Sequence, residues 1–169
     1  MDDTTGSKTP ASHKPGGSGM WMMNQIANPF VRMVLRSPFH PLFSGSLALI
    51  TYQGRKSGKE YTIPVQYVQT GITIYIVPGA AKQKTWWRNL RGGAPVRLVL
   101  RGRNIKGMAQ VLQGERDKTA IAEALVPYFQ RFPAAARPQH LQPAPSGSYN
   151  PDDLGRIAAS MVMVRVTLG

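Results

Sequence analysis

The sequence predicts a mixed α+β fold, in which a mostly antiparallel sheet of about six strands closes into a small barrel with flanking helices. Short loops join most of the predicted strands, and such hairpin connections produce antiparallel pairs. Several strands have little polar face, which favours closure of the sheet. Helical spacing of apolar residues occurs in only three or four segments. A length of 169 residues fits a single domain.

The chain divides into a polar tail and one folded domain. Residues 1–19 are rich in Gly, Ser, Thr and Pro, and this composition is typical of disorder. The domain is predicted to occupy residues 20–169. It begins with a helix over Met20–Ser37, where apolar residues recur at spacings of three, four and seven and Pro29 interrupts the pattern.

The strands and helices of the domain follow in a regular order. The predicted strands are Ser46–Tyr52, Glu60–Val68, Ile72–Val77, Val96–Arg101, Ile105–Leu112 and Met161–Leu168. A tight turn at residues 69–71 predicts that the second and third of these strands pair with each other. The predicted helices are Lys84–Arg91, Gly114–Phe132 and Asp152–Ala159, and the segment between the last two is a loop rich in Pro and Ser.

The charge of the chain is strongly positive and unevenly distributed. The net charge is +13, and between Trp21 and Leu112 there are thirteen Lys or Arg against one acid, Glu60. Such a field attracts nucleic acid, anionic lipid, or a phosphorylated or polycarboxylated ligand. The sequence contains no stretch of about 20 apolar residues, so no membrane-spanning helix is predicted.

The stretch Gly54–Lys59 gathers three cations at a predicted hairpin tip. Two glycines frame Arg55, Lys56 and Ser57, so that backbone N–H groups and a hydroxyl can converge on one anion. A solvated tip that happens to be basic is the alternative, since Gly and Ser are ordinary turn residues. The spacing of the glycines and the absence of a following helix exclude a Walker loop.

Two further features lie close to this tip in the sequence. Pro64 interrupts a strand pattern, which predicts either an edge strand or an edge that lies against a flat ligand. Lys82–Leu90 contains two tryptophans between cations, and it is predicted to be a packed helix with exposed charges or a second wall of one anion site.

The residues that usually carry acid–base catalysis are scarce. The chain has no cysteine, and His13, His40 and His140 have no serine or carboxylate partner at a recognisable spacing. The acids are too few and scattered for a carboxylate pair or a metal site. We therefore predict no catalytic side chain and no metal, and an enzyme of this composition would take its chemistry from a cofactor.

Residues 46–112 resemble the deazaflavin-dependent nitroreductase family, whose flavin and deazaflavin oxidoreductases have a split β-barrel. The resemblance is carried by ALITYQGRKSGKEYTIPVQYV and KQKTWWRNLRGGAPVRLVLRG, in the same order and spacing as in the family. This chain departs from the family pattern at Tyr61, where an Arg is usual, and at Ile63, where an Asn is frequent. Residues 77–80 and 93–95 also replace family motifs, so this is a divergent member.

The resemblance implies a cofactor and its binding residues. The cofactor is the deazaflavin coenzyme F420, with FMN as the alternative. The implied phosphate and tail contacts are Arg55, Lys56, Ser57, Gly58, Lys82 and Lys84, and the implied ring and helix contacts are Pro64, Trp86, Trp87 and Asn89. An acceptor pocket is expected at Tyr128, Phe129 and Phe132, although such aromatic residues belong to a core more often than to a substrate wall.

The resemblance also implies an activity, a hydride transfer from the reduced coenzyme to an electron-poor acceptor such as a quinone, an activated alkene or a nitro compound. The alternative is a non-catalytic protein of the same fold that binds a lipid or quinone at a membrane surface. In that case Met20–Arg36, rich in Met and carrying Arg, would contact anionic lipid. Nucleic-acid binding ranks last, because aromatic residues do not alternate regularly with the cations. A cytoplasmic location and a homodimer are further expectations.

Overall fold

The computed structural model describes residues 45–169. The predictions of a disordered tail over residues 1–19 and of a helix over Met20–Ser37 lie outside these residues, as does the alternative in which Met20–Arg36 contacts anionic lipid. Within residues 45–169, no helix is long and apolar enough to cross a membrane.

The described chain forms seven strands, two α-helices and several short 3-10 helices. The strands are β1 (Leu47–Gln53), β2 (Glu60–Gln66), β3 (Val68–Thr70), β4 (Thr73–Ile76), β5 (Ala94–Leu100), β6 (Arg103–Gln113) and β7 (Val162–Leu168). The α-helices are α3 (Lys118–Arg131) and α4 (Pro151–Ala158). The 3-10 helices are η1 (Trp86–Leu90), η2 (Gly114–Asp117), η3 (Pro133–Ala135) and η4 (Arg137–Gln139). The mixed α+β split barrel with flanking helices is thus confirmed, with seven strands in place of about six.

All seven strands belong to one antiparallel sheet in the order β2-β1-β5-β6-β7-β4-β3. Strands β2 and β3 lie at opposite ends of this order, yet only Tyr67 separates them in the chain. The chain therefore passes from one edge of the sheet directly to the other, and the sheet curls into a half-open barrel.

The predicted pairing of Glu60–Val68 with Ile72–Val77 is wrong for most of its length. Glu60–Gln66 pairs with β1, and only the segment from Val68 to Thr70 pairs with β4. The reason is a change of partner at Tyr67, whose N–H donates to the carbonyl of Ser46 at 3.1 Å. The two halves of the predicted strand thereby join different edges of the barrel.

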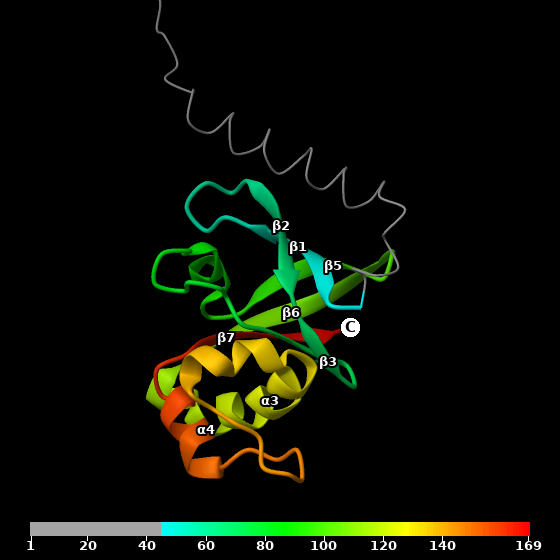
Figure 1. The fold of residues 1–169 in the computed structure, drawn as a ribbon. Helices are drawn as coiled ribbons and strands as arrows, with labels where there is room; N and C mark the ends of the chain where they lie inside the picture. The colour runs from blue at the N-terminus through cyan, green and yellow to red at the C-terminus, as the bar shows by residue number, and fades with distance from the viewer. Residues whose placement is uncertain (1–44) are drawn as a thin grey trace, which may run out of the picture.

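Apolar side chains form two cores. One fills the barrel and includes Ile50, Leu98 and Val164, each fully buried. The other lies between the sheet and the helices and includes Ile121, Leu125 and Met163. Figure 1 shows α3 and α4 side by side below the barrel, so the helices cover one end of the sheet. Among residues 45–169 no strand pairs with the outer edge of β2, which lies beside the loop that follows β4.

Candidate functional site

The tip between β1 and β2 is closed by its own backbone. The N–H of Gly54 donates to the carbonyl of Lys59 and the N–H of Gly58 donates to that of Gly54, each at 2.8 Å. Gly58 has φ +65°, a left-handed conformation that favours glycine. The side chains of Arg55, Lys56 and Ser57 are exposed on this fixed loop.

The free edge of β2 presents backbone polar groups in alternation. Backbone hydrogen bonds join Gly54 to Lys59 and Ser46 to Tyr67. Lys59 and Tyr67 are an even number of residues apart, so the odd-numbered residues between them are the ones that face β1. The backbone groups of Thr62, Pro64 and Gln66 therefore point away from β1. Pro64, which lacks an N–H, occupies a position where no ladder bond is lost. The prediction of an edge strand at Pro64 is confirmed.

Helix η1 holds the tip in place through its side chains. Asn89 Oδ1 accepts a hydrogen bond from the backbone N–H of Arg55 at 3.0 Å, and Asn89 Nδ2 donates to the carbonyl of Trp86 at 2.9 Å. Trp87 is buried, and its Nε1 donates to the carbonyl of Ala81 at 3.1 Å. The tip and the loop before η1 are thus both attached to the same short helix.

A cleft of about 520 Å³ lies between the tip and η1. Its cations are Lys56 and Lys84, which face it from the tip and from the loop before η1. Its other lining residues are uncharged, namely Tyr52, Gly54, Ser57, Tyr61, Thr62, Ile63, Thr85, Trp86 and Asn89. We call this site the tip cleft.

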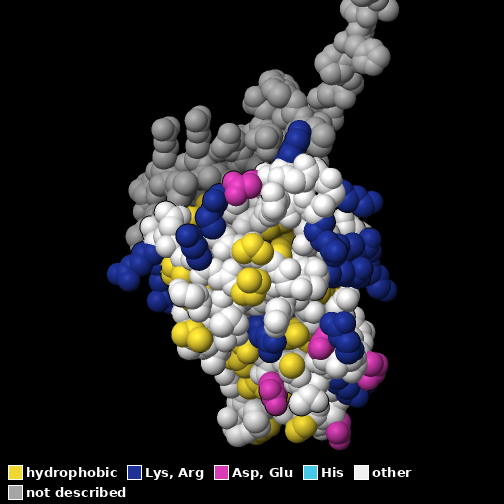
Figure 2. Space-filling model, turned by 180° about the vertical axis from the view of Figure 1, so that it is seen from behind, with side chains coloured by type: hydrophobic (Ala, Val, Ile, Leu, Met, Phe, Trp, Pro, Cys, Tyr) yellow, Lys and Arg dark blue, Asp and Glu magenta, His cyan; other side chains and the backbone are white. Residues whose placement is uncertain are grey.

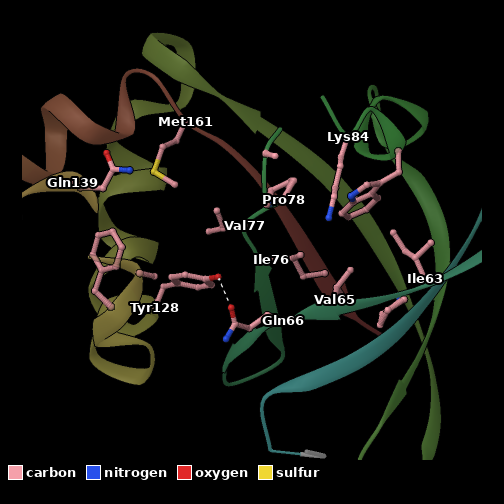
Figure 3. Close-up of a pocket in the computed structure, with 16 residues that line it drawn as sticks. Ile63, Val65, Gln66, Ile76, Val77, Pro78, Lys84, Tyr128, Gln139 and Met161 are labelled. Atoms are coloured by element: carbon pink, nitrogen blue, oxygen red, sulfur yellow. Dashed lines mark hydrogen bonds between the residues drawn. The ribbon is translucent and has the colours of Figure 1, made fainter. Parts of the chain in front are cut away.

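An apolar cavity of about 760 Å³ continues from the tip cleft. Ile63, Lys84 and Trp86 line both spaces, so the two are adjacent. The apolar cavity is bounded by β2, by Ile76–Ala80 and by α3 (Figure 3). Figure 3 shows Lys84 pointing into it from the side opposite Tyr128.

A hydrogen bond at the end of the apolar cavity joins α3 to β2. The hydroxyl of Tyr128 donates to Gln66 Oε1 at 3.4 Å (Figure 3). Burial raises the pKa of Tyr128, so its hydroxyl stays protonated at neutral pH. The cavity therefore ends in neutral hydrogen-bonding groups.

Acidic residues are rare around both spaces. Within residues 45–169, every acid except Glu60 lies between positions 115 and 153, and Glu60 pairs with Arg97 at 2.9 Å. Figure 2 shows Lys and Arg side chains over much of one face, with most acidic side chains toward the helical end. The field at the tip cleft is accordingly positive and favours an anion.

The structure brings together eight of the thirteen predicted site residues. Five line the tip cleft: Lys56, Ser57, Lys84, Trp86 and Asn89. Pro64, Tyr128 and Phe129 line the apolar cavity, as do Lys84 and Trp86.

The other five predicted residues lie outside the linings of both spaces. Arg55 turns away, with its guanidinium 3.4 Å from the carbonyl of Arg91, and Trp87 packs in the barrel core. Lys82 faces a separate hollow beside Ser160. Gly58 lies at the outer end of the tip, and Phe132 packs against Tyr128 with ring centroids 5.1 Å apart.

Sequence reasoning missed several lining residues. Tyr61 follows the same alternation as Ile63 and Val65, so only its place beside the tip could have indicated a role. Gln66 stands two residues after Pro64 on the free edge, a signal that becomes visible only once that edge is known. Gln139 and Met161 come from distant parts of the chain and carried no signal.

Comparison with known protein families shows to which family the chain belongs. The model of the F420H(2)-dependent quinone reductase family matches residues 38–131, more than half of the chain. The chain belongs to this family. It is therefore an oxidoreductase that uses the deazaflavin coenzyme F420.

Solved structures show weaker likenesses to this reductase. An F420-H2 dependent reductase (FDR-A) has 17% identity and a TM-score of 0.49, over 72% of this chain and 93% of that one. A domain-swapped dimer has 16% identity and a TM-score of 0.49, over 82% and 98%. The FAD and heme binding protein from Mycobacterium smegmatis has 14% identity and a TM-score of 0.39, over 79% and 67%. No curated protein matches the sequence significantly.

The two adjacent spaces fit the two chemical halves of coenzyme F420. Its phosphate and glutamates require cations and donors, which the tip cleft offers in Lys56, Lys84 and Ser57. Its planar ring requires apolar walls with a few polar groups, which the apolar cavity offers in Pro64, Val65 and Trp86. The residues present therefore fit the coenzyme.

Proposed function

We propose that this reductase transfers a hydride from reduced coenzyme F420 to an electron-poor acceptor, with a quinone as the first choice and activated alkenes or nitro compounds as further acceptors. The observation that supports this is the continuity of a cationic cleft with an apolar cavity through Ile63, Lys84 and Trp86. A coenzyme placed along this groove would have its anionic tail outside and its ring inside.

The anionic part of the coenzyme is assigned to the tip cleft. Lys56 and Lys84 neutralise the phosphate from two sides, and Ser57 supplies a hydroxyl donor. Asn89 acts indirectly, because both ends of its amide hold the backbone of the tip and of η1. Arg55, Gly58 and Lys82 stand outside the cleft and would act on the coenzyme only at longer range.

The ring of the coenzyme is assigned to the free edge of β2. The Pro64 carbonyl and the Gln66 N–H both point away from β1, so they offer an acceptor and a donor to a planar heterocycle. Trp86 closes the opposite side, and Trp87 keeps the loop before η1 in position. When bound, the coenzyme supplies the hydride from its carbon 5.

The acceptor is assigned to the remaining apolar space near α3. Tyr128 and Phe129 line it, and Phe132 supports the ring of Tyr128 from behind. None of the described residues that line the two spaces is an acid or a histidine. The side chains of this chain therefore orient the reactants and exclude water, and the Tyr128 hydroxyl keeps its one hydrogen on Gln66.

A titration tests the proposed function. Coenzyme F420 and FMN are added separately to the full chain while the fluorescence of each cofactor is followed. We expect saturable binding of coenzyme F420 and oxidation of its reduced form when a short-chain naphthoquinone is added. Binding without turnover of any quinone, alkene or nitro acceptor would contradict the proposed hydride transfer, and no binding of either cofactor would favour the non-catalytic alternative, in which the same fold binds a lipid or quinone.

A further inference from the structure

Two hydroxyl groups meet at the floor of the tip cleft. The hydroxyl oxygens of Ser57 and Tyr61 are 3.1 Å apart, within hydrogen-bond distance. The Ser57 oxygen also accepts a hydrogen bond from the backbone N–H of Lys59 at 3.3 Å. Both side chains line the cleft that Lys56 and Lys84 make positive.

A count of hydrogen atoms shows what this pair can offer to a ligand. Each hydroxyl carries one hydrogen, and the bond between the two oxygens uses only one of them. If Tyr61 donates to Ser57, the Ser57 hydrogen remains free, and if Ser57 donates, the Tyr61 hydrogen remains free. In either arrangement one O–H donor is left for the cleft, and an anion there selects the arrangement that points the hydrogen toward it.

We propose that Tyr61 is a positioning residue that orients the Ser57 hydroxyl as a donor to the phosphate of the coenzyme. The inference rests on the proposed function, because it needs a phosphate-bearing ligand in the tip cleft.

The ring of Tyr61 packs against two residues of β1 and its end, so its hydroxyl has a defined place. It stacks on Tyr52, with ring centroids 5.8 Å apart and planes inclined by 25°. It also lies close to Gly54, where an added Cβ would come within 2.7 Å of the Tyr61 ring and 2.6 Å of the Ser57 oxygen. Gly54 is therefore the residue that allows tip, ring and hydroxyl pair to pack together.

The aromatic neighbours keep the wall of the cleft neutral. Burial, and then the nearby Tyr61, raise the pKa of Tyr52 to about 12. Tyr52 thus remains an uncharged phenol throughout the physiological pH range and does not repel an anion. Tyr52 also contacts Trp86, with centroids 5.9 Å apart, so the stack extends to the place assigned to the ring of the coenzyme.

A double-mutant cycle tests the inference. The variants are Tyr61→Phe, Ser57→Ala and the double variant, with Tyr75→Phe on β4 as the matched control outside both spaces. The ligands are coenzyme F420 and its ring fragment, the deazaflavin that keeps the ribityl chain but lacks the phosphate. Dissociation constants are measured by fluorescence titration, and thermal unfolding confirms that each variant is folded. Phe keeps the ring on Gly54, so the fold should survive.

We expect Tyr61→Phe to weaken coenzyme binding about three- to tenfold, the effect of one hydrogen bond. Ser57→Ala should weaken it at least as much, and the double variant should match Ser57→Ala, because Tyr61 acts through Ser57. Ser57→Thr, which keeps the hydroxyl, should restore binding to within about twofold. The ring fragment and the control variant should show no change.

Three results would overturn the inference while leaving the proposed function intact. These are unchanged affinity of Tyr61→Phe, losses that multiply in the double variant, and an equal loss for the ring fragment. If the unmodified protein binds neither ligand, the proposed function itself is wrong, and the role of Tyr61 is rejected together with it.

Discussion

The tip cleft and the apolar cavity are neighbours, yet they are built in opposite ways. One wall of the tip cleft comes from a single stretch, Tyr52–Ile63, which is closed by local backbone bonds and bears the exposed side chains of Lys56 and Ser57. The apolar cavity gathers residues from β2, β4, α3 and the segment before β7. Phe129 and Tyr128 line it and also belong to the core between the sheet and the helices.

Because of this difference, mutations in the tip cleft should affect ligand binding, whereas mutations in the apolar cavity should also affect the stability of the fold. A charge in the tip cleft can be removed without leaving a void, because the side chain is exposed. A wall of the apolar cavity cannot be removed in the same way, because the side chain also fills the core. Under the proposed function, mutation can therefore alter the residues assigned to the anionic tail at a smaller cost in stability than those assigned to the acceptor.

The largest effect is expected in the apolar cavity. Phe129→Ala should lower the free energy of unfolding by about 3–5 kcal/mol, because a fully buried ring is lost from the helical core. Urea unfolding followed by circular dichroism measures the change. Lys56→Ala is the matched control in the tip cleft and should change stability by less than about 0.5 kcal/mol. Equal losses in both variants would remove the distinction between the two sites.

The next effect is expected in the tip cleft. Lys56→Ala and Lys84→Ala should each weaken binding of coenzyme F420 by more than about tenfold, since a charge-assisted contact contributes about 1.5–3 kcal/mol. Lys59→Ala is the control, because Lys59 belongs to the same tip but does not line the cleft. Fluorescence titration measures the affinities. A loss at Lys59 as large as at Lys56 would show that only the general field matters.

The salt dependence of ligand affinity should distinguish the two sites without any mutation. Raising the ionic strength from about 0.05 to 0.5 M shortens the screening length well below 10 Å, so the affinity for coenzyme F420 should fall several-fold. The affinity for the phosphate-free ring fragment should stay nearly constant, because apolar contacts dominate its binding. Parallel titrations of the two ligands give the comparison. The same salt dependence for both would contradict the assignment of the tail to the cleft.

The smallest effect is expected for the aromatic stack between the two sites, and it is a change in melting temperature at alkaline pH. The pKa of Tyr52 is about 12 in the folded chain and about 10 when unfolded, so the folded state holds this proton more tightly. The resulting stabilisation is fully present below pH 10 and is lost as the pH rises through 12. Tyr52→Phe should therefore reduce the fall in melting temperature between pH 10 and 12. A fall as steep as that of the parent protein would contradict the shifted pKa.

The parts of the molecule that depend on local sequence were predictable. The glycines around Arg55 and Lys56, the edge position of Pro64 and the β5–β6 hairpin all follow from short-range signals. The bend at Tyr67 was not predictable, because no Gly or Pro marks it and both halves keep a strand pattern. It depends on hydrogen bonds to β1 and β4, which lie far from each other in the sheet order.

The candidate site likewise contains residues that the local sequence predicts and residues that only the closed barrel brings together. Lys56, Ser57 and Lys84 are recognisable from composition and from the resemblance, whereas Gln66, Gln139 and Met161 meet only after the barrel has closed. Arg55 was assigned to the ligand by its charge, but Asn89 holds its backbone N–H and its side chain turns to Arg91. A sequence motif identifies which residues gather at a loop and leaves open which of them face inward.

The position of β7 bears on how the chain is made in the cell. This strand inserts between β6 and β4, and among residues 45–169 it is the one partner of Thr73–Ile76 on that side. A ribosome releases residues in order, so β4 keeps an open edge until Val162–Leu168 has been made, and an open edge can pair with other chains. Termination before Val162 would leave β3 and β4 detached from the rest of the sheet. Synthesis through β7 is thus a condition for closing the barrel, and products that end before it should aggregate.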